Sequence, residues 1–461
     1  MQPSIQRRRR LRSALKAALP LCAGLSLVAS VLAVNGGATY VHASDDSSSW
    51  VGAWGASPIQ PLGPNNTLGT PQQFVNQTIR SIVNPHLAGQ TVRIRISNKF
   101  GNQPITFTSV FIGNGVGGGS PAIVPGTNTP LTFSGSSSVT IQPGNRVYSD
   151  PAPLRVQPFQ DLVISYYTPS LTGPATQHTN AQQLSYVAAG NQASATTGAY
   201  LPDGESWYFL TDVDVTASTN ADDDVTASTN AGSVVTLGNS ITDGLESTIN
   251  ANHRYPDFLA QRLQASGTQS CLSVVNEGIA GNRVLYPNIG PSTVNRLQSD
   301  VLSQPNVRAI ILEDGINDLA DPPFLDPTGT QQVTAQQVYN GLVQIANQAH
   351  ARGIKVFATT LTPSGDLADP ARPPFTTYST PQVEAKRNAL NQLIRNNGGV
   401  FDGVFDFELA VANPANHNEF NPIYANVDNF HPNDLGYQQL ANTVNLPALG
   451  SCYGSSEEGG D

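Results

Sequence analysis

The sequence predicts two folded domains, an all-β region followed by an α/β region built on a parallel sheet. Residues 50–212 contain short segments in which apolar and polar residues alternate, and residues from 233 onward contain short apolar runs that alternate with helical segments. The chain has 461 residues, which is more than a single hydrophobic core usually serves. With 39% apolar and 12% charged residues, its composition suits a folded protein.

Residues 1–43 have the layout of a secretory signal peptide. Basic residues within 7–16 precede an apolar run at 17–34, and the small residues before Ser44 suit cleavage near Ala43. We therefore expect a secreted, extracellular protein. The alternative is an uncleaved membrane anchor, because an apolar run of this length can just span a bilayer.

Cleavage near Ala43 leaves an acidic protein. It removes six basic residues and no acidic ones, so 17 basic residues stand against 33 acidic ones and the formal charge falls from −10 to −16. Such a charge disfavours nucleic acid and anionic membranes as partners, and we expect no stable membrane insertion after cleavage. Two cysteines remain, Cys271 and Cys452, which in an oxidising compartment either form a disulfide or stay as separate thiols.

Residues 44–212 are expected to form a β-sandwich of jelly-roll type. The alternation is clearest in "TVRIRISN" (91–98), and turns rich in Gly, Pro and Asn separate this segment from similar ones at 104–113, 138–149 and 161–169. No long helical period interrupts them, so a sandwich is the natural architecture. Two roles are compatible with such an accessory domain, namely binding a carbohydrate or polymer for its neighbour and stabilising that neighbour.

A short tandem repeat separates the two regions. "DVTASTNA" occurs at 214–221 and again at 224–231. Because both copies are polar and short, residues 213–231 are expected to be a linker. A calcium site built on the aspartates at 222–224 is the alternative. Residues 454–461 are expected to be a flexible tail.

Residues 232–453 alternate between short strands and helices. This order predicts a parallel sheet covered on both faces, and such a sheet binds ligands at the carboxyl ends of its strands. The expected strands are 234–238, 272–276, 308–313, 355–361 and 403–407. The expected helices are 254–266, 292–303, 334–352, 381–397 and 433–445.

Four polar segments lie at or after these strand ends and are expected to meet at one edge of the sheet. They are "GNS" (238–240), "NEGIAGNR" (276–283), "EDGINDL" (313–319) and "DNFHPND" (428–434). The chemistry that fits them is acyl transfer. Ser240 is the candidate nucleophile, His431 the base that takes its proton, and Asp428 the acceptor that fixes the histidine tautomer.

The same segments offer donors for the oxyanion of a tetrahedral intermediate. The candidates are the backbone N–H groups of Ser240 and Gly281 and the side-chain amide of Asn317. Each residue alone also has an ordinary structural interpretation, as a helix cap or a turn residue. Their joint occurrence in this order at strand ends favours a catalytic site.

The segments "TLGNSITDG", "GIAGNR", "GINDL" and "DNFHPND" resemble the four motif blocks of the SGNH, or GDSL-type, esterases and lipases. The resemblance covers about residues 232–446. It implies Ser240, His431 and Asp428 as the triad, Gly281 and Asn317 as oxyanion donors, and hydrolysis without metal or cofactor. It also implies a flavodoxin-like, three-layer fold with a five-stranded parallel sheet. No G-x-S-x-G turn surrounds Ser240, which argues against an ordinary α/β-hydrolase.

Asn239 departs from this family pattern, in which an aspartate usually precedes the serine. Asparagine keeps the shape and an acceptor oxygen but lacks the charge. We expect that the turn remains ordered and activity survives. The alternative is that the missing charge weakens the protonated histidine, in which case Asn239→Asp would raise the rate.

These observations predict a secreted serine esterase that acts on short-chain or acetyl esters of a carbohydrate. The alternatives are a lipase or acylhydrolase on lipid esters and a catalytically silent glycan-binding protein. A metal-dependent hydrolase is disfavoured, because the chain has no H-E-x-x-H and no paired C-x-x-C. Three long loops lie at 319–333, 362–380 and 412–427. Either they wall the substrate pocket through Phe324, Phe375, Tyr378 and Tyr424, or they are surface loops without a role at the site.

Overall fold

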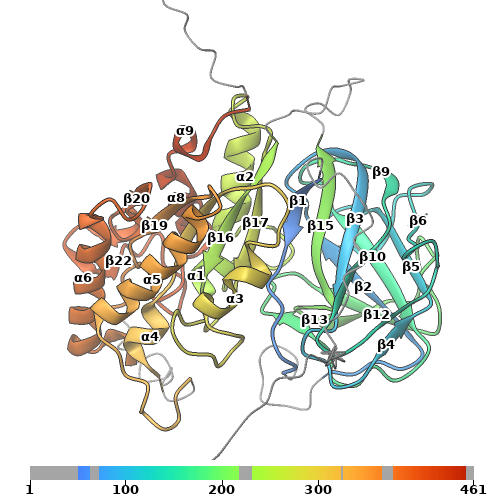
Figure 1. The fold of residues 1–461 in the computed structure, drawn as a ribbon, viewed down its shortest axis with the longest axis horizontal. Coiled ribbons are helices and arrows are strands. Elements are labelled where there is room, and N and C mark those ends of the chain that lie inside the picture. Colours follow the sequence, from blue (N-terminus) through green and yellow to red (C-terminus); the bar gives the residue numbers. More distant parts are fainter. Residues whose placement is uncertain (1–49, 63–71, 218–230, 323–324, 366–376, 453–461) are drawn as a thin grey trace, which may run out of the picture. The chain divides into compact units, whose positions relative to one another are not determined.

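The computed structural model describes residues 50–62, 72–217, 231–322, 325–365 and 377–452. The described residues belong to one compact unit (Figure 1). The expected signal peptide, the aspartates at 222–224 and the expected tail lie outside the described residues, as do Phe324 and Phe375.

The N-terminal β-region, residues 50–217, is built from antiparallel strands. One sheet runs in the order β1 (Trp50–Gly55), β15 (Leu210–Ala217), β3 (Gly89–Ser97) and β8 (Arg146–Tyr148), with β9 (Ala152–Val156) also paired to β3. The other runs in the order β13 (Leu201–Gly204), β12 (Ser185–Ala189), β2 (Gln77–Val83), β10 (Leu162–Thr168), β5 (Ser109–Asn114) and β6 (Thr129–Pro130). Two small pairs complete it, β11 (Gln177–Thr179) with β14 (Ser206–Tyr208) and β4 (Ile105–Phe107) with β7 (Val139–Ile141).

The two larger sheets share a hydrophobic core. Ile94 of β3 and Ile79 of β2 are fully buried in the same cluster, as the alternating pattern of a half-buried strand requires. The all-β prediction for this region is therefore confirmed, while the jelly-roll connection of the strands stays a prediction.

Strand β15 extends beyond residue 212, where we expect the linker to begin. Val213 and Val215 point into the core, and Asp214 on the opposite face pairs with Arg93 of β3 at 3.0 Å. The alternation that marks a strand thus continues into the first copy of the repeat. Residues 213–217 therefore belong to β15 and not to the expected linker, and residues 218–230 of that expected linker lie outside the described residues.

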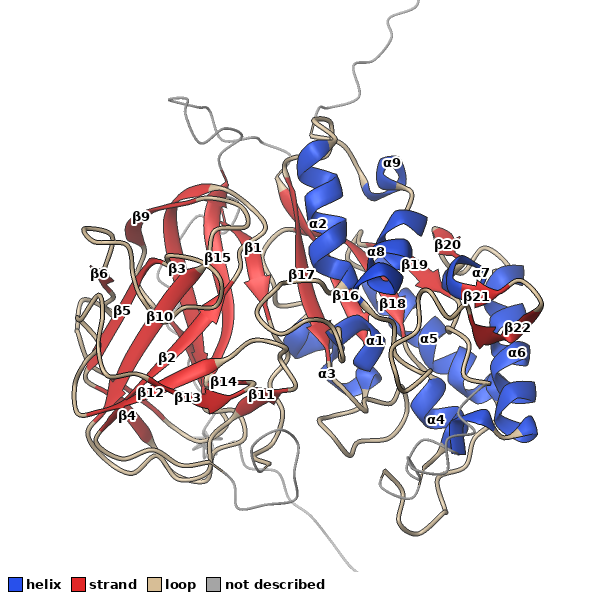
Figure 2. Cartoon of the chain, turned by 180° about the vertical axis from the view of Figure 1, so that it is seen from behind, coloured by secondary structure: helices blue, strands red, loops and turns tan. Residues whose placement is uncertain are grey.

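The α/β region contains a five-stranded, fully parallel sheet. Its order is β17 (Leu272–Gly278), β16 (Gly232–Gly238), β18 (Val307–Glu313), β19 (Lys355–Thr359) and β20 (Gly403–Phe405). The strands are thus arranged 2-1-3-4-5 in chain order, the flavodoxin-like arrangement. All five expected strands are present, and β16 is buried at every residue because helices cover both faces (Figure 2).

Adjacent residues of β16 enter different cores. Val234 belongs to the cluster with α2 (Tyr255–Ala265) and α8 (Asp434–Thr443), whereas Val235 belongs to the cluster with α5 (Ala335–His350) and α6 (Pro381–Asn396). The five expected helices are α2 (Tyr255–Ala265), α3 (Thr293–Asp300), α5 (Ala335–His350), α6 (Pro381–Asn396) and α8 (Asp434–Thr443). Shorter elements add α1 (Ser240–Asp243), α4 (Ile316–Ala320), α7 (Phe407–Val411), α9 (Leu446–Leu449) and the pair β21 (Ala412–Asn413) and β22 (Asn416–Phe420). Among the described residues, no helix is both long and apolar enough to cross a membrane.

A disulfide joins Cys271 to Cys452 and resolves the two alternatives for these cysteines. Their Cα atoms lie 5.5 Å apart and their sequence separation is 181 residues. The bond ties the segment after α9 to the residue that precedes β17. It closes a loop containing most of the α/β region, so it limits the conformations of the unfolded chain.

Candidate active site

The carboxyl edge of the parallel sheet collects the predicted site residues. Ser240 is the first residue of α1, directly after β16, and Asn317 is the second residue of α4, after β18. Gly281 lies in the loop after β17, and Asp428 and His431 lie in the loop before α8. The central position of β16 between β17 and β18 brings the first three together.

Asn239 and Gly238 shape the turn that carries Ser240. Asn239 is the N-cap of α1, since its Oδ1 accepts the backbone N–H of Ile241 at 2.9 Å. Gly238 packs so closely on β18 that a Cβ atom there would lie 1.9 Å from the carbonyl oxygen of Glu313. A glycine is therefore required at the end of β16.

Ser240, His431 and Asp428 form a continuous hydrogen-bonded chain. His431 Nε2 lies 2.9 Å from Ser240 Oγ, and His431 Nδ1 lies 2.6 Å from Asp428 Oδ2. All three residues are buried. The contact with Asp428 places a proton on Nδ1, which leaves Nε2 free to accept the serine proton.

Asp428 is held as a carboxylate by its neighbours. Burial disfavours its charge, but hydrogen bonds from His431 and from the backbone N–H groups of Phe430 and His431 outweigh this effect and lower its pKa. These N–H groups contact Oδ1 at 3.0 and 2.9 Å. The other oxygen is left for the imidazole, so the carboxylate can both orient and stabilise a protonated His431.

The amide of Asn317 has one hydrogen available for a ligand. Its Nδ2 donates to the carbonyl oxygen of Asn282 at 2.8 Å, and its Oδ1 accepts from the hydroxyl of Tyr378 at 2.6 Å. The second hydrogen on Nδ2 has no partner among these contacts. Gly281 adopts a φ of 80°, a left-handed conformation that favours glycine.

Tyr378 has a different place from the one we expect for it in the pocket wall. It is fully buried, its ring packs on Phe430 with centroids 4.5 Å apart, and its hydroxyl contacts Asn317. Burial raises the pKa of Tyr378, so the phenol remains a donor. Because the phenol donates, the amide of Asn317 must turn its oxygen toward Tyr378. Its nitrogen then points in the opposite direction, so Tyr378 fixes the orientation of the amide. Tyr424, the other described aromatic of these loops, is partly buried against the core.

Asn239 lies between two buried carboxyl groups. Its Nδ2 faces Glu313 Oε1 at 3.3 Å and Asp314 Oδ1 at 3.5 Å. Burial raises the pKa of Asp314 to about 6, and burial followed by the charge of Asp314 raises the pKa of Glu313. An amide donor suits this environment better than a third carboxyl group does. The neutral residue at 239 is therefore matched to its acidic neighbours.

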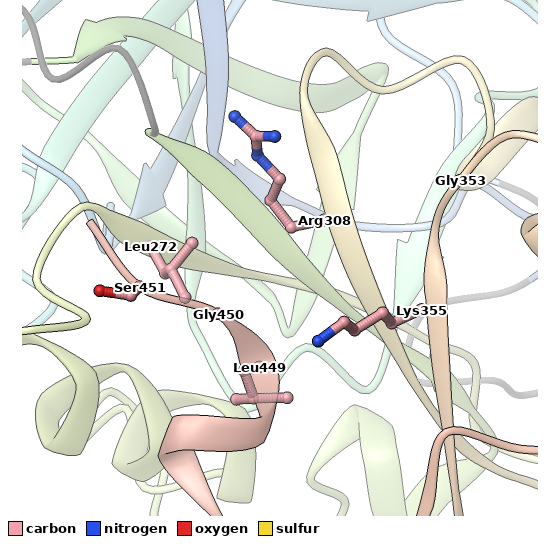
Figure 3. A pocket seen from close by; sticks show the side chains of 7 residues that line it. All are labelled: Leu272, Arg308, Gly353, Lys355, Leu449, Gly450 and Ser451. Carbon is pink, nitrogen blue, oxygen red and sulfur yellow. The ribbon is translucent and has the colours of Figure 1, made fainter. Parts of the chain in front are cut away.

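A separate pocket lies at the opposite, amino edge of the sheet (Figure 3). It has a volume of about 280 Å³, and Leu272, Arg308 and Lys355 line it from the starts of three strands. Of the described residues, leucine, serine and cationic side chains line it, and no histidine or carboxylate does. Within the described ranges, no three His, Cys, Asp or Glu side chains are grouped as a metal site.

Tyr378→Phe tests the orientation of the Asn317 amide. Loss of the hydroxyl lets the amide rotate without removing the donor itself. On the predicted role of Asn317 as an oxyanion donor, we expect kcat in an ester-hydrolysis assay to fall about 10-fold, less than the loss of a whole donor. KM should change by less than about twofold, because the contact acts on the transition state. Steady-state kinetics measure both values.

Tyr339→Phe is the matched control for this substitution. Its hydroxyl donates to the carbonyl oxygen of Asn397, away from the site, at 3.3 Å. An unchanged kcat in Tyr378→Phe, or an equal fall in both variants, would contradict the orienting role.

Asn239→Asp tests the electrostatic match at position 239. Burial and two neighbouring carboxyl groups should raise the pKa of the introduced carboxyl above its unfolded value. A carboxyl whose folded pKa is raised costs stability as pH rises between the two values. We expect a deficit against wild type that is small at pH 4, is about half complete at pH 5 and reaches about 2–3 kcal/mol at pH 8, with no gain in rate.

Denaturant unfolding at several pH values measures this deficit. Asn239→Ser is the control, because serine also caps a helix and adds no charge, so its deficit should not change with pH. If Asn239→Asp is as stable as wild type at pH 8, or hydrolyses ester faster, the account is contradicted. A negative charge at position 239 would then matter more than the fit of a neutral amide to its acidic neighbours.

Comparisons with known proteins address the α/β region. Residues 236–439 match the model of the GDSL-like lipase/acylhydrolase family. A solved structure of a member of the lipolytic protein G-D-S-L family from Veillonella parvula is similar, with 16% identity, a TM-score of 0.33 and coverage of 46% of this chain and 94% of that one. A carbohydrate acetylesterase from Sinorhizobium meliloti has 17% identity, a TM-score of 0.35 and coverage of 45% and 94%. An acetyl xylan esterase has 20% identity, a TM-score of 0.33 and coverage of 46% and 96%. Among curated proteins, none matches this chain.

Proposed function

Because residues 236–439 form a GDSL-like lipase/acylhydrolase domain, we propose that this protein is a serine esterase with Ser240 as its nucleophile. The observation that carries the proposal is the buried chain of hydrogen bonds from Ser240 through His431 to Asp428. A serine hydroxyl becomes a useful nucleophile when a base of suitable pKa accepts its proton in this way.

The first half of the reaction forms an acyl-enzyme. Ser240 Oγ bonds to the carbonyl carbon of the ester while His431 Nε2 takes the hydroxyl proton, and the carbonyl oxygen becomes an oxyanion. When this intermediate collapses, the bond to the leaving oxygen breaks and His431 returns the proton to it, which releases an alcohol. Asp428 stabilises the imidazolium throughout.

The second half returns the enzyme to its starting state. A water molecule gives a proton to His431 and attacks the acyl carbon, and the acid leaves as Ser240 recovers its proton. The donors for both oxyanions are the backbone N–H groups of Ser240 and Gly281 and the free hydrogen on Asn317 Nδ2. Preorganised donors of this kind supply a large part of the acceleration in acyl transfer.

Short-chain esters, such as acetyl groups on a carbohydrate, are the proposed substrates. Lipid esters are a second candidate, because apolar side chains flank the residues of the triad. Val427, next to Asp428, is 75% exposed, and Ile423 and Leu435 are more than half exposed. We further propose that the protein is exported, which the Cys271–Cys452 disulfide supports because such bonds persist in oxidising compartments.

Ser240→Ala tests the serine mechanism. With p-nitrophenyl acetate as substrate, we expect kcat to fall by about 10⁴-fold or more, since no other group can form the acyl-enzyme. Ser247→Ala is the control, because this nearby buried hydroxyl has no hydrogen-bond partner among the described residues and its loss should leave the rate unchanged. Equal rates for wild type and Ser240→Ala would refute the mechanism and favour the silent glycan-binding alternative.

A chain-length series separates the two substrate classes. We expect kcat/KM for the acetyl ester to exceed that for the octanoyl ester by about 10-fold or more, a difference that a pocket too short for the longer chain can produce. An acetylated glycan should lose acetate at a comparable rate. A preference for the octanoyl ester that disappears in Val427→Asp would instead establish the lipid class.

A further inference from the structure

The loop that carries Gly281 is anchored on both sides. The backbone N–H of Ala280 donates to Asp243 Oδ2 at 2.9 Å. On the other side, Asn282 Oδ1 accepts from Arg296 Nε at 2.8 Å and from Thr293 Oγ1 at 2.7 Å. Asn282 also supplies the carbonyl oxygen that receives Asn317 Nδ2. The two anchors therefore determine where the N–H of Gly281 and the amide of Asn317 point.

The first anchor leads into the N-terminal β-region through His178. This residue of β11 places its Nε2 at 3.0 Å from Asp243 Oδ1, and its Nδ1 at 2.9 Å from the carbonyl oxygen of Ser57. A carbonyl oxygen only accepts, so Nδ1 must carry a proton. Nε2 then faces the carboxylate of Asp243, and both side chains are almost fully buried.

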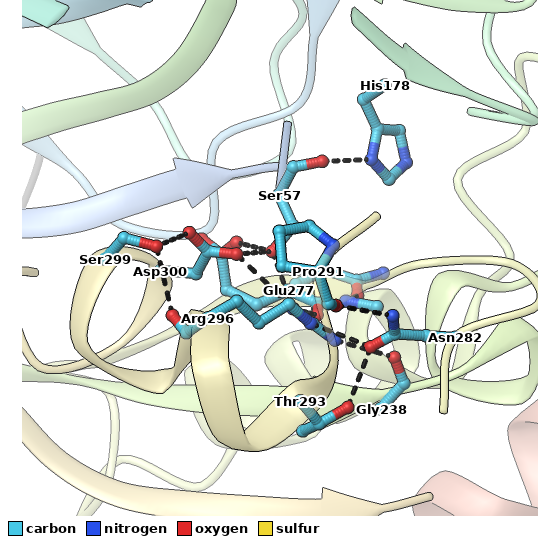
Figure 4. A network of polar contacts seen from close by, with 12 residues as sticks. Ser57, His178, Gly238, Glu277, Asn282, Pro291, Thr293, Arg296, Ser299 and Asp300 are labelled. Carbon is cyan, nitrogen blue, oxygen red and sulfur yellow. Dashed lines mark hydrogen bonds and ion pairs between the residues drawn. The ribbon is translucent and has the colours of Figure 1, made fainter. Parts of the chain in front are cut away.

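The second anchor leads to Ser57 of the β-region, the residue whose carbonyl oxygen His178 contacts (Figure 4). Arg296, which is fully buried, donates from Nη1 to Ser57 Oγ at 2.8 Å and from Nη2 to the carbonyl oxygen of Gly238 at 2.9 Å. One guanidinium thus contacts the end of β16, the side chain of Asn282 and the β-region. Ser57 joins the two anchors, because its carbonyl accepts from His178 and its hydroxyl from Arg296.

We propose that the N-terminal β-region is part of the catalytic apparatus, in which His178 and Ser57 act as positioning residues for the oxyanion donors. His178 orients Asp243, which holds the Ala280 amide, and Ser57 supports Arg296, which holds Asn282. The Gly281 N–H and the Asn317 amide are thereby preorganised before substrate binds.

The packing of the two regions agrees with this role. At Gly55 of β1, a Cβ atom would lie 2.5 Å from Val275 Cγ1 of β17, so the strands approach as closely as a core permits. A buried polar contact such as His178–Asp243 contributes little net stability, because the cost of desolvation offsets the attraction. The contact instead orients the carboxylate of Asp243, which holds the loop of Gly281.

Two isosteric substitutions at His178 separate its two contacts. His178→Asn retains a donor near the position of Nδ1 and loses the contact with Asp243, whereas His178→Gln retains a donor near the position of Nε2. Amide hydrogen exchange of the full chain is the measurement, since it reports local opening of the loop. We expect exchange at Ala280 and Asn282 to be about 10-fold faster in His178→Asn and within about twofold of wild type in His178→Gln.

His86→Asn is the matched control. His86 is another buried histidine of the β-region, but its contacts are the carbonyl of Val274 inside β17 and the carboxylate of Asp257 on α2. Its loss should lower stability without faster exchange at Ala280. Ser57→Ala is a second test that leaves His178 in place, and it should accelerate exchange at Asn282. Protection of β16 and β18 in the same experiment reports whether each variant is folded.

Kinetics give the functional readout, which rests on the proposed esterase activity. We expect kcat to fall about 10-fold in His178→Asn with KM nearly unchanged, and to stay within about twofold in His178→Gln and His86→Asn. Unchanged exchange at Ala280 in folded His178→Asn, or the same acceleration in His86→Asn, overturns the proposal. If His178→Asn does not fold, unchanged exchange at Asn282 in Ser57→Ala overturns it. Absence of esterase activity in the wild-type protein would overturn the proposed function instead. The exchange result does not depend on that activity, so it tests the positioning role separately.

Discussion

The close packing of the carboxyl end of β16 on β18, and of the carboxyl end of β17 on α1, is the constraint on which the site depends. A Cβ atom at Gly238 would lie 1.9 Å from the carbonyl oxygen of Glu313, and one at Gly278 would lie 2.2 Å from the backbone nitrogen of Asp243. These glycines let α1 begin at once after β16 and rest on β17. The Gly281 loop consequently contacts both α1 and α4, since Ala280 donates to Asp243 and Asn317 donates to Asn282.

Buried carboxyl groups surround this junction and explain why a neutral asparagine suits position 239. Asp314 has its pKa raised to about 6 by burial, and Asp318 has its pKa raised to about 8 by burial and by Asp314. Asp318 nevertheless accepts backbone N–H groups from Val284 and Leu285 at 2.7 and 3.0 Å, which holds the segment after Gly281. In such surroundings an amide at position 239 caps α1 and donates to its acidic neighbours, so asparagine suits the turn without a compensating charge elsewhere.

Much of this arrangement could be predicted from the sequence. Short apolar runs give the five parallel strands, and the polar segments after them give Ser240, Gly281, Asn317, Asp428 and His431. These signals are local, since each depends on residues adjacent in the chain. The end of strand β15 is harder to predict, because the alternation of apolar and polar residues continues into a repeat whose composition is typical of a linker.

The contacts that support the site are not local, and for this reason the sequence does not reveal them. Tyr378 and Asn317 are 61 residues apart, and His178 and Asp243 are 65 residues apart. Nothing in the sequence around His178 distinguishes it from His86, although only the first contacts α1. The sequence of the β-region does not distinguish an accessory domain from a positioning element. The difference lies in which of its side chains contact the residues that hold the Gly281 loop.

Covalent labelling of Ser240 tests the central claim most directly. A serine-directed phosphonate forms a stable adduct only with a hydroxyl that a neighbouring base activates. Intact-mass and peptide analysis of the full chain should find one adduct, on Ser240, and hydrolysis of p-nitrophenyl acetate should fall in proportion to the labelled fraction. An adduct on another residue, or full hydrolysis by a fully labelled protein, would contradict the account.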